Sequence, residues 1–112
     1  MSSLARVAAA EVGPDRYVVR ASGHIDVEVV AELRDALLPI AAADGAHVLL
    51  DLGDAIQIDR ASLHVIASAA RLSRRRGDDL GVVTRDPTFA TRLAATGAFV
   101  QYHESVRGWS AQ

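Results

Sequence analysis

The sequence predicts a single α/β domain, in which a mixed sheet of four to five strands carries helices mainly on one face. Its 112 residues suit one domain. An apolar run at residues 48–52 is rich in branched side chains, which is typical of a strand buried on both faces. Strand and helix patterns alternate after the first two strands, which favours right-handed crossovers. We expect one domain over residues 1–112, with its core at about residues 4–106.

The first two predicted strands form a hairpin. Its strands are expected at residues 4–12 and 17–21, and the second segment is β-branched and aromatic. The intervening Gly13-Pro14-Asp15 is typical of a turn, and Gly23 is expected to end the second strand. An open edge on this hairpin would allow strands of two copies to pair, so a weak homodimer is a further expectation.

A first amphipathic helix is expected after Asp26, a residue suited to an N-cap. Pro39 has no N–H to donate, so the helix should kink or end near Leu38. The apolar residues recur at steps of three and four and form one stripe: Val29, Val30, Leu33, Leu37 and Ile40.

A second helix is expected at about residues 60–76, after a loop that begins at Gly53-Asp54 and ends at the N-cap Asp59. One apolar stripe should pack on the sheet: Leu63, Ile66, Ala67 and Ala70. A second stripe should meet either the first helix or a partner protein: Ser62, Val65, Ala69 and Leu72. The neighbouring helix is the simpler explanation, because helices on one side of a sheet touch.

The remaining segments complete the alternation. Residues 80–84 and 98–102 are predicted strands, and Asp86-Pro87 between them favours a helix start. Val106 and Trp109 have the spacing of residues on one face of a helix, so a final helical turn could pack on the body of the domain.

Composition excludes several functional classes. The formal net charge of −2 argues against a general nucleic-acid binder. The chain has no cysteine, hence no thiol chemistry, and its four histidines show no metal-binding spacing. Its opening residues are too short and too charged for a signal peptide, and no segment approaches the ~18 apolar residues of a membrane span. These features predict a cytoplasmic protein without cofactor or metal.

The central segment carries a family resemblance. It reads VLLDLGDAIQIDRASLHVIASAARLSRRRG and resembles the signature of STAS domains, the bacterial anti-sigma factor antagonists, in which an apolar strand, Asp-Leu and a loop precede Ile-Asp-Ser-Ser-Gly-Leu. Upstream, GHIDVEVVAELRDAL resembles the family's first helix and the Gly-Glu-Leu-Asp segment before it. Downstream, LGVVTRDPTFATRLAATGAFVQYHESV resembles its last strand–helix–strand unit. The resemblance covers roughly residues 16–106.

The resemblance implies a non-enzymatic regulator that binds an anti-sigma factor, a GHKL-type serine kinase, and so releases a sigma factor. The chain departs from the family where the switching phosphate is carried, because Arg60-Ala61 replaces the Ser-Ser pair. Such a protein would act as the unphosphorylated form does, or it would be regulated at Ser62, the phosphorylation candidate. The partner-binding candidates are Asp54, Gln57, Asp59, Arg60, Ser62, Val65 and Ala69.

Two alternatives remain open from the sequence. The same family resemblance would also suit a module for nucleotide or small-ligand sensing or a stress-signalling scaffold, although this chain has no Gly-rich phosphate loop. A metal-assisted hydrolase could use Asp51, Asp54 and Asp59 to hold Mg²⁺. This second alternative lacks a nucleophile and base at a suitable spacing, and two of these acids have simpler roles as a cap and a turn residue.

Overall fold

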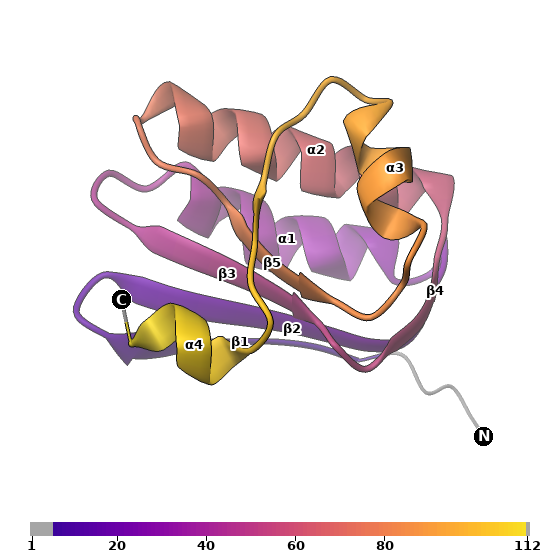
Figure 1. The fold of residues 1–112 in the computed structure, drawn as a ribbon, viewed down its shortest axis with the longest axis horizontal. Coiled ribbons are helices and arrows are strands. Elements are labelled where there is room, and N and C mark those ends of the chain that lie inside the picture. The colour runs from indigo at the N-terminus through magenta and orange to yellow at the C-terminus, as the bar shows by residue number, and fades with distance from the viewer. Residues whose placement is uncertain (1–5, 112) are drawn as a thin grey trace.

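A computed structural model describes residues 6–111 of the chain. Within them a sheet of six strands carries the two longer helices on one face (Figure 1). The strands are β1 (Arg6–Gly13), β2 (Arg16–Ile25), β3 (His47–Leu52), β4 (Ala55–Ile58), β5 (Gly81–Thr84) and β6 (Gln101–Tyr102). The helices are α1 (Val30–Ala41), α2 (Arg60–Arg75), α3 (Phe89–Ala94) and α4 (Val106–Ser110).

The sheet is mixed, as the sequence predicts. β1 pairs antiparallel with β2 in the hairpin, and the main order continues through β3, β5 and β6 in parallel pairs. β4 lies off this path and pairs in parallel with the end of β2. The predicted count of four to five strands was too low, because residues 55–58 were expected to be a loop. A strand of four residues that pairs with a distant segment leaves little periodic signal.

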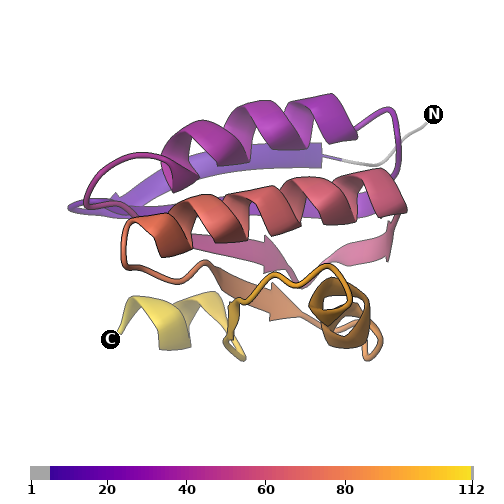
Figure 2. The ribbon, with the colours of Figure 1, turned by 90° about the horizontal axis from the view of Figure 1, so that it is seen from above.

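The two longer helices lie side by side over the sheet, as Figure 2 shows from above. The main core lies between them and the sheet, where Leu33, Leu37, Leu50 and Ile66 are fully buried. α4 covers the opposite face, where Trp109 packs with Val18, Leu49 and Val83. The expected final helical turn is therefore confirmed, and helices occupy both faces with the larger share on one.

The second apolar stripe of α2 faces the interior. Ser62 and Ala69 have no exposed surface, while Val65 and Leu72 are partly buried against the main core. α1 lies directly beside α2. The neighbouring helix is therefore what this stripe meets.

Several boundaries differ from the predictions. β2 does not end at Gly23, which adopts a φ of +80° within the strand, and pairing with β4 carries β2 on to Ile25. Asp26 is not the N-cap of α1: its carboxylate accepts a hydrogen bond from the Glu28 backbone N–H (3.0 Å), and one further turn precedes the cap residue Val29. Pro39 lies inside α1, in its last turn, and the helix runs on to Ala41.

Similar differences occur near the C-terminus. The Asp86 carboxylate accepts hydrogen bonds from the N–H and hydroxyl of Thr88, so it stabilises the turn before α3 and is not the N-cap itself. The last strand keeps only Gln101 and Tyr102 of the predicted residues 98–102. The predicted start of the first strand at Leu4 lies outside the described residues.

Candidate docking surface at the β4–α2 junction

The turn between β3 and β4 is fixed by a buried carboxylate. Asp51 accepts a hydrogen bond from the Arg20 Nε on the neighbouring strand β2 (2.9 Å). Its other oxygen accepts from the Gly53 backbone N–H (2.9 Å). The Asp54 carbonyl oxygen then accepts from the Gly23 N–H (3.0 Å), which brings the chain to the end of β2. Asp51 thus anchors the turn, and Asp54 is left exposed at its tip.

A register shift in β4 turns one apolar side chain outward. Gly23 is opposite Ala55 and His24 is opposite Gln57, so Ile56 is the extra residue between two paired positions. Such an irregularity re-aims a side chain and is frequent at functional sites. Ile56 is 70% exposed, whereas Ile58 two residues later is 3% exposed. The surface of β4 therefore presents Ile56 and Gln57 together.

The start of α2 continues this surface. The Asp59 carboxylate accepts a hydrogen bond from the Ser62 backbone N–H (2.9 Å), which confirms Asp59 as the N-cap. Arg60 and Ala61, which replace the Ser-Ser pair of the resembled signature, are both exposed. We define the docking surface as Asp54, Ile56, Gln57, Arg60 and Ala61, with Asp59 partly exposed beside them.

Three of the partner-binding residues suggested by the sequence, Ser62, Val65 and Ala69, do not lie on this surface. Ser62 and Ala69 are both 0% exposed, so neither side chain is available to another protein in this conformation. Val65 is partly buried against the core. The second stripe of α2 is therefore largely covered by the domain itself.

The same burial affects the phosphorylation candidate. The Ser62 Oγ is enclosed and has no hydrogen-bond partner among the described residues. A kinase cannot reach this hydroxyl without opening the helix pair. Exposed positions for a phosphate acceptor at this junction are those of Arg60 and Ala61, which carry no hydroxyl.

Two of the three carboxylates near this junction serve the fold. Asp51 is engaged by Arg20 and Gly53, and Asp59 is engaged by Ser62. Within residues 6–111 no group of three or more histidine, cysteine or acidic side chains is placed to hold a metal ion. The three-aspartate magnesium site of the hydrolase alternative is therefore not formed in this part of the chain.

Ile56 was not among the docking residues predicted from the sequence. Val27, 68% exposed in the connection between β2 and α1, is a second exposed apolar side chain near this end of the sheet. Strand alternation would place Ile56 and Ile58 on the same face, and only the pairing with β2 shows that one of them points outward.

A comparison with models of known protein families agrees with this fold. The STAS domain family model matches residues 7–106.

The chain belongs to the STAS domain family.

Solved structures share the fold of this STAS domain at low sequence identity. The anti-sigma factor antagonist SpoIIAA in its unphosphorylated form is 10% identical, with a TM-score of 0.77, over 95% of this chain and 94% of that one. An anti-sigma factor antagonist from Mycobacterium paratuberculosis is 19% identical, with a TM-score of 0.74, over 96% and 93%. A serine-to-glutamate variant of RsbS from Moorella thermoacetica is 20% identical, with a TM-score of 0.72, over 95% and 93%.

Two further observations complete the comparison. A search of curated proteins found no match to this STAS domain. Among the described residues, no helix combines the length and apolar character needed to cross a bilayer.

Proposed function

We propose that this STAS domain is a cytoplasmic regulator of the anti-sigma factor antagonist class. It binds an anti-sigma factor, a GHKL-type serine kinase, and so releases a sigma factor. It acts by binding and carries no catalytic site of its own. The family match supports the class, and two solved proteins of the same fold are themselves described as anti-sigma factor antagonists.

The observation that carries this proposal is the exposed junction of β4 and α2. The register shift presents an isoleucine there that is 70% exposed, next to a glutamine and an arginine. An exposed apolar side chain surrounded by polar groups is typical of a protein–protein contact. Ile56 is the apolar centre of the contact, while Asp54, Gln57 and Arg60 form its polar rim.

The proposal predicts a partner that depends on Ile56. Wild-type protein used as bait in extracts of its native host should retain a protein with a GHKL-type ATPase domain, identified by mass spectrometry. Ile56→Asp should abolish retention, because a charge would replace the buried centre of the contact. Val12→Asp is the matched control, since Val12 is an exposed apolar residue on β1 (48% exposed). Loss of the kinase with both variants, or with neither, would contradict the proposed surface.

Arg60-Ala61 makes this protein a form that its kinase cannot phosphorylate at the junction. Ala61→Ser would place a hydroxyl on an exposed position of the first turn of α2, where free backbone N–H groups tolerate a phosphate. We expect kinase and ATP to phosphorylate Ala61→Ser or the double variant Arg60→Ser/Ala61→Ser, and the modified protein to leave the kinase. Wild type should carry no phosphate at Ser62. Phosphate on Ser62 of folded wild type would reject this account.

A further inference from the structure

The two helices on the main face of the sheet carry opposite charges. Residues 26–35, which are the turn before α1 and its first half, contain four acidic residues and one arginine. Residues 60–76, which are α2 and its C-cap, contain five arginines and no acidic residue. The net charge of the whole chain is only −2. Charge is therefore separated by helix, and an acidic α1 lies beside a basic α2 (Figure 2).

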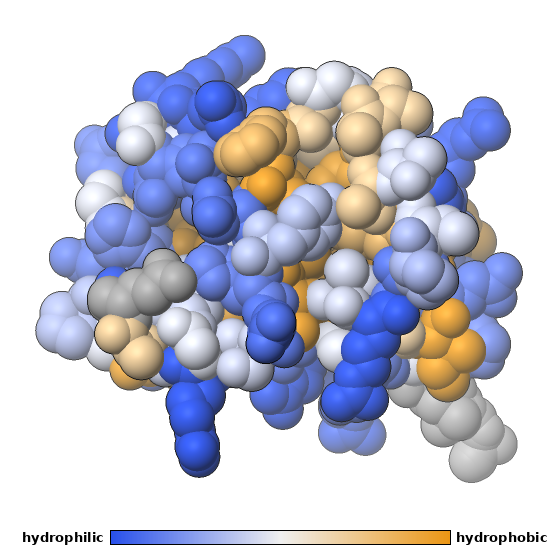
Figure 3. Space-filling view, in the orientation of Figure 1, coloured by the Kyte–Doolittle hydropathy of each residue, from blue (hydrophilic) through white to orange (hydrophobic). Residues whose placement is uncertain are grey.

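The helix dipole accounts for only part of this separation. Glu32 is in the first turn of α1, an end that favours an acid. Arg74 and Arg75 are in the last turn of α2, an end that favours cations, and hydrophilic side chains gather over this end in Figure 3. Arg60 is different, because it is in the first turn of α2, where a cation opposes the dipole. A residue that a local rule disfavours can indicate a function.

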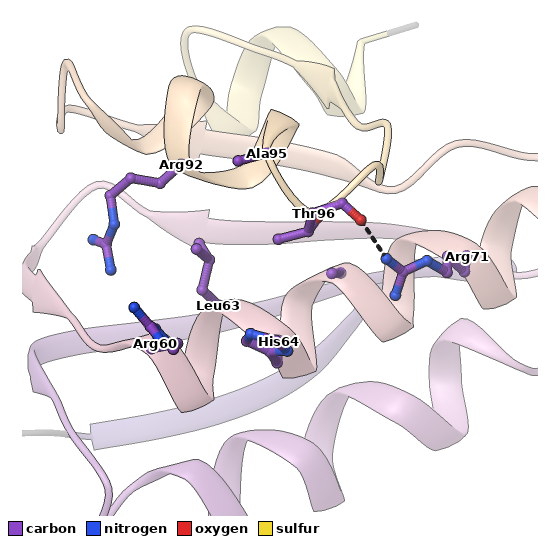
Figure 4. Close-up of a pocket in the computed structure, with 8 residues that line it drawn as sticks. Arg60, Leu63, His64, Arg71, Arg92, Ala95 and Thr96 are labelled. Atoms are coloured by element: carbon purple, nitrogen blue, oxygen red, sulfur yellow. Dashed lines mark hydrogen bonds between the residues drawn. The ribbon is translucent and has the colours of Figure 1, made fainter.

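The charges on these helices are not neutralised within the domain. Figure 4 shows Arg71 donating a hydrogen bond to the Thr96 carbonyl oxygen (2.7 Å), whereas Arg60 on the same helix has no such contact. Among residues 6–111 no ion pair joins α1 to α2. Several exposed side chains in this part of the chain take part in no ion pair or hydrogen bond, among them Glu28, Glu32, Arg60 and Arg75.

Neighbouring helices of opposite sign restrict the kind of partner that fits this face. A nucleic acid or an anionic membrane would be attracted to α2 and repelled by α1 beside it. A basic partner would meet the reverse arrangement. A second copy of the chain offers both signs at once, because its α1 suits α2 and its α2 suits α1.

The topology brings the charged starts of the two helices to one end of the sheet. α1 follows β2 and α2 follows β4, and these strands end side by side with Ile25 opposite Ile58. Both helices then connect parallel strands, so they run in the same direction. A two-fold axis parallel to the helices therefore places α1 of each copy along α2 of the other, with the first turns at the same level.

We infer that the exposed face of α1 and α2 binds a second copy of this chain. Glu28 and Glu32 of one copy face Arg60 of the other, and the symmetry makes this contact twice. The acids also offset the unfavourable cation at the start of α2. Three partly exposed side chains add a small apolar contact: Leu38, Val65 and Leu72. The dimer is weak and sensitive to salt, because exposed charge pairs are screened.

The test is a pair of reciprocal charge reversals in the full chain. Glu28→Arg/Glu32→Arg makes the start of α1 basic, and Arg60→Glu/His64→Glu makes the start of α2 acidic. Sedimentation equilibrium in about 50 mM salt should show a wild-type dimer that dissociates at higher salt. Each variant alone should raise the dimer Kd at least about tenfold. An equimolar mixture of the two should associate about as tightly as wild type, because every contact then joins opposite charges.

Two controls make the result specific to the helices. Arg75→Glu/Arg85→Glu carries a comparable negative charge at other exposed positions, so its mixture with Glu28→Arg/Glu32→Arg should not associate. Ala9→Lys lies on the open edge strand β1 and should dimerise as wild type does.

Three results would overturn the inference. They are a wild type that stays monomeric at every concentration, a reciprocal mixture no tighter than the control mixture, and a dimer that is lost in Ala9→Lys and kept in both charge reversals. The last result would assign the self-association to the β1 edge.

The inference does not depend on the proposed function, although Arg60 belongs to both surfaces. Glu28 and Glu32 lie off the docking surface, so Glu28→Arg/Glu32→Arg should lose self-association and keep the kinase. Ile56→Asp should lose the kinase and dimerise as wild type does. The two proposals therefore fail separately.

Discussion

At the scale of single residues, Asp59 connects the docking surface to the stability of the fold. Its carboxylate satisfies the Ser62 N–H at the start of α2, and its own N–H donates to the Ile25 carbonyl oxygen (3.0 Å). The same residue therefore begins the helix and holds β4 against β2. Replacing its side chain tests the first role alone, since the backbone contact remains.

Asp59→Ala should lower the free energy of unfolding by about 1 kcal/mol, because the N-cap hydrogen bond is lost. Asp59→Asn should retain most of this stability, since an amide oxygen also caps. Urea unfolding followed by circular dichroism measures both. Asp54→Ala, at the exposed tip of the turn, is the control and should differ little from wild type.

Replacing Ser62 by alanine should stabilise the fold, in contrast to the loss of stability expected for Asp59→Ala. A buried hydroxyl without a partner is destabilising, so Ser62→Ala should raise the free energy of unfolding by about 1 kcal/mol. Ser62→Asp should lower the free energy of unfolding by about 3 kcal/mol or more, because it buries a charge. Ala61→Asp, one residue earlier and exposed, should be close to wild type. A fully stable Ser62→Asp protein would show that this position is not enclosed.

At the scale of elements, local signals explain what the sequence could predict. Three predictions rest on signals that span only a few residues, and all three are confirmed. They are the N-cap Asp59, the helical period of α2 and the apolar run of β3. β4 was missed because its pairing partner lies about thirty residues away and the register shift removes strand alternation. The burial of Ser62 and Ala69 was not predicted for a related reason: whether a stripe is covered depends on α1, which periodicity alone does not place.

The sheet and α4 meet closely at Gly81. A Cβ atom there would lie 2.8 Å from the Leu49 Cδ1 and 3.2 Å from the His103 Cδ2. Gly81→Ala should therefore lower the free energy of unfolding by about 1–3 kcal/mol through overpacking. Trp109, which packs beside this position, is the only tryptophan of the chain, so its fluorescence reports any displacement of α4.

A rescue variant makes the Gly81 prediction specific. Gly81→Ala/Leu49→Val removes the atom in closest contact and should recover part of the stability. If Gly81→Ala alone unfolds at the same urea concentration as wild type, the close contact is not a constraint on the fold.

At the scale of the whole molecule, two side chains give stability a dependence on pH. Hydrogen bonds from the Thr88 backbone N–H and hydroxyl hold the pKa of Asp86 below its ordinary value of 3.8. This contribution is present above about pH 4 and is lost as the pH falls through the folded pKa. Burial raises the pKa of Tyr102 above its ordinary value of 10.0. The contribution of Tyr102 to the free energy of unfolding is present below pH 10.0 and is lost as the pH rises through the folded pKa of this residue.

Unfolding experiments across pH should separate the two groups. Asp86→Asn should lose less stability than wild type when the pH is lowered below about 4. Tyr102→Phe should lose less than wild type above about pH 10. Identical acid and alkaline profiles for wild type and the matching variant would contradict the assigned pKa directions.

The open edge of the sheet belongs to this scale as well. β1 pairs with β2, and Ala8, Ala9 and Ala10 along it are exposed. Pairing of two copies through this edge stays a prediction, which sedimentation at increasing protein concentration would test.

The placement of α4 has a practical consequence. In Figures 1 and 2 this helix lies at the opposite end of the molecule from β4. The chain contains no cysteine, and Ser110 is exposed on α4. Ser110→Cys would thus give a unique thiol for attaching a dye or a sensor chip, and the immobilised molecules would all direct the proposed docking surface away from the support.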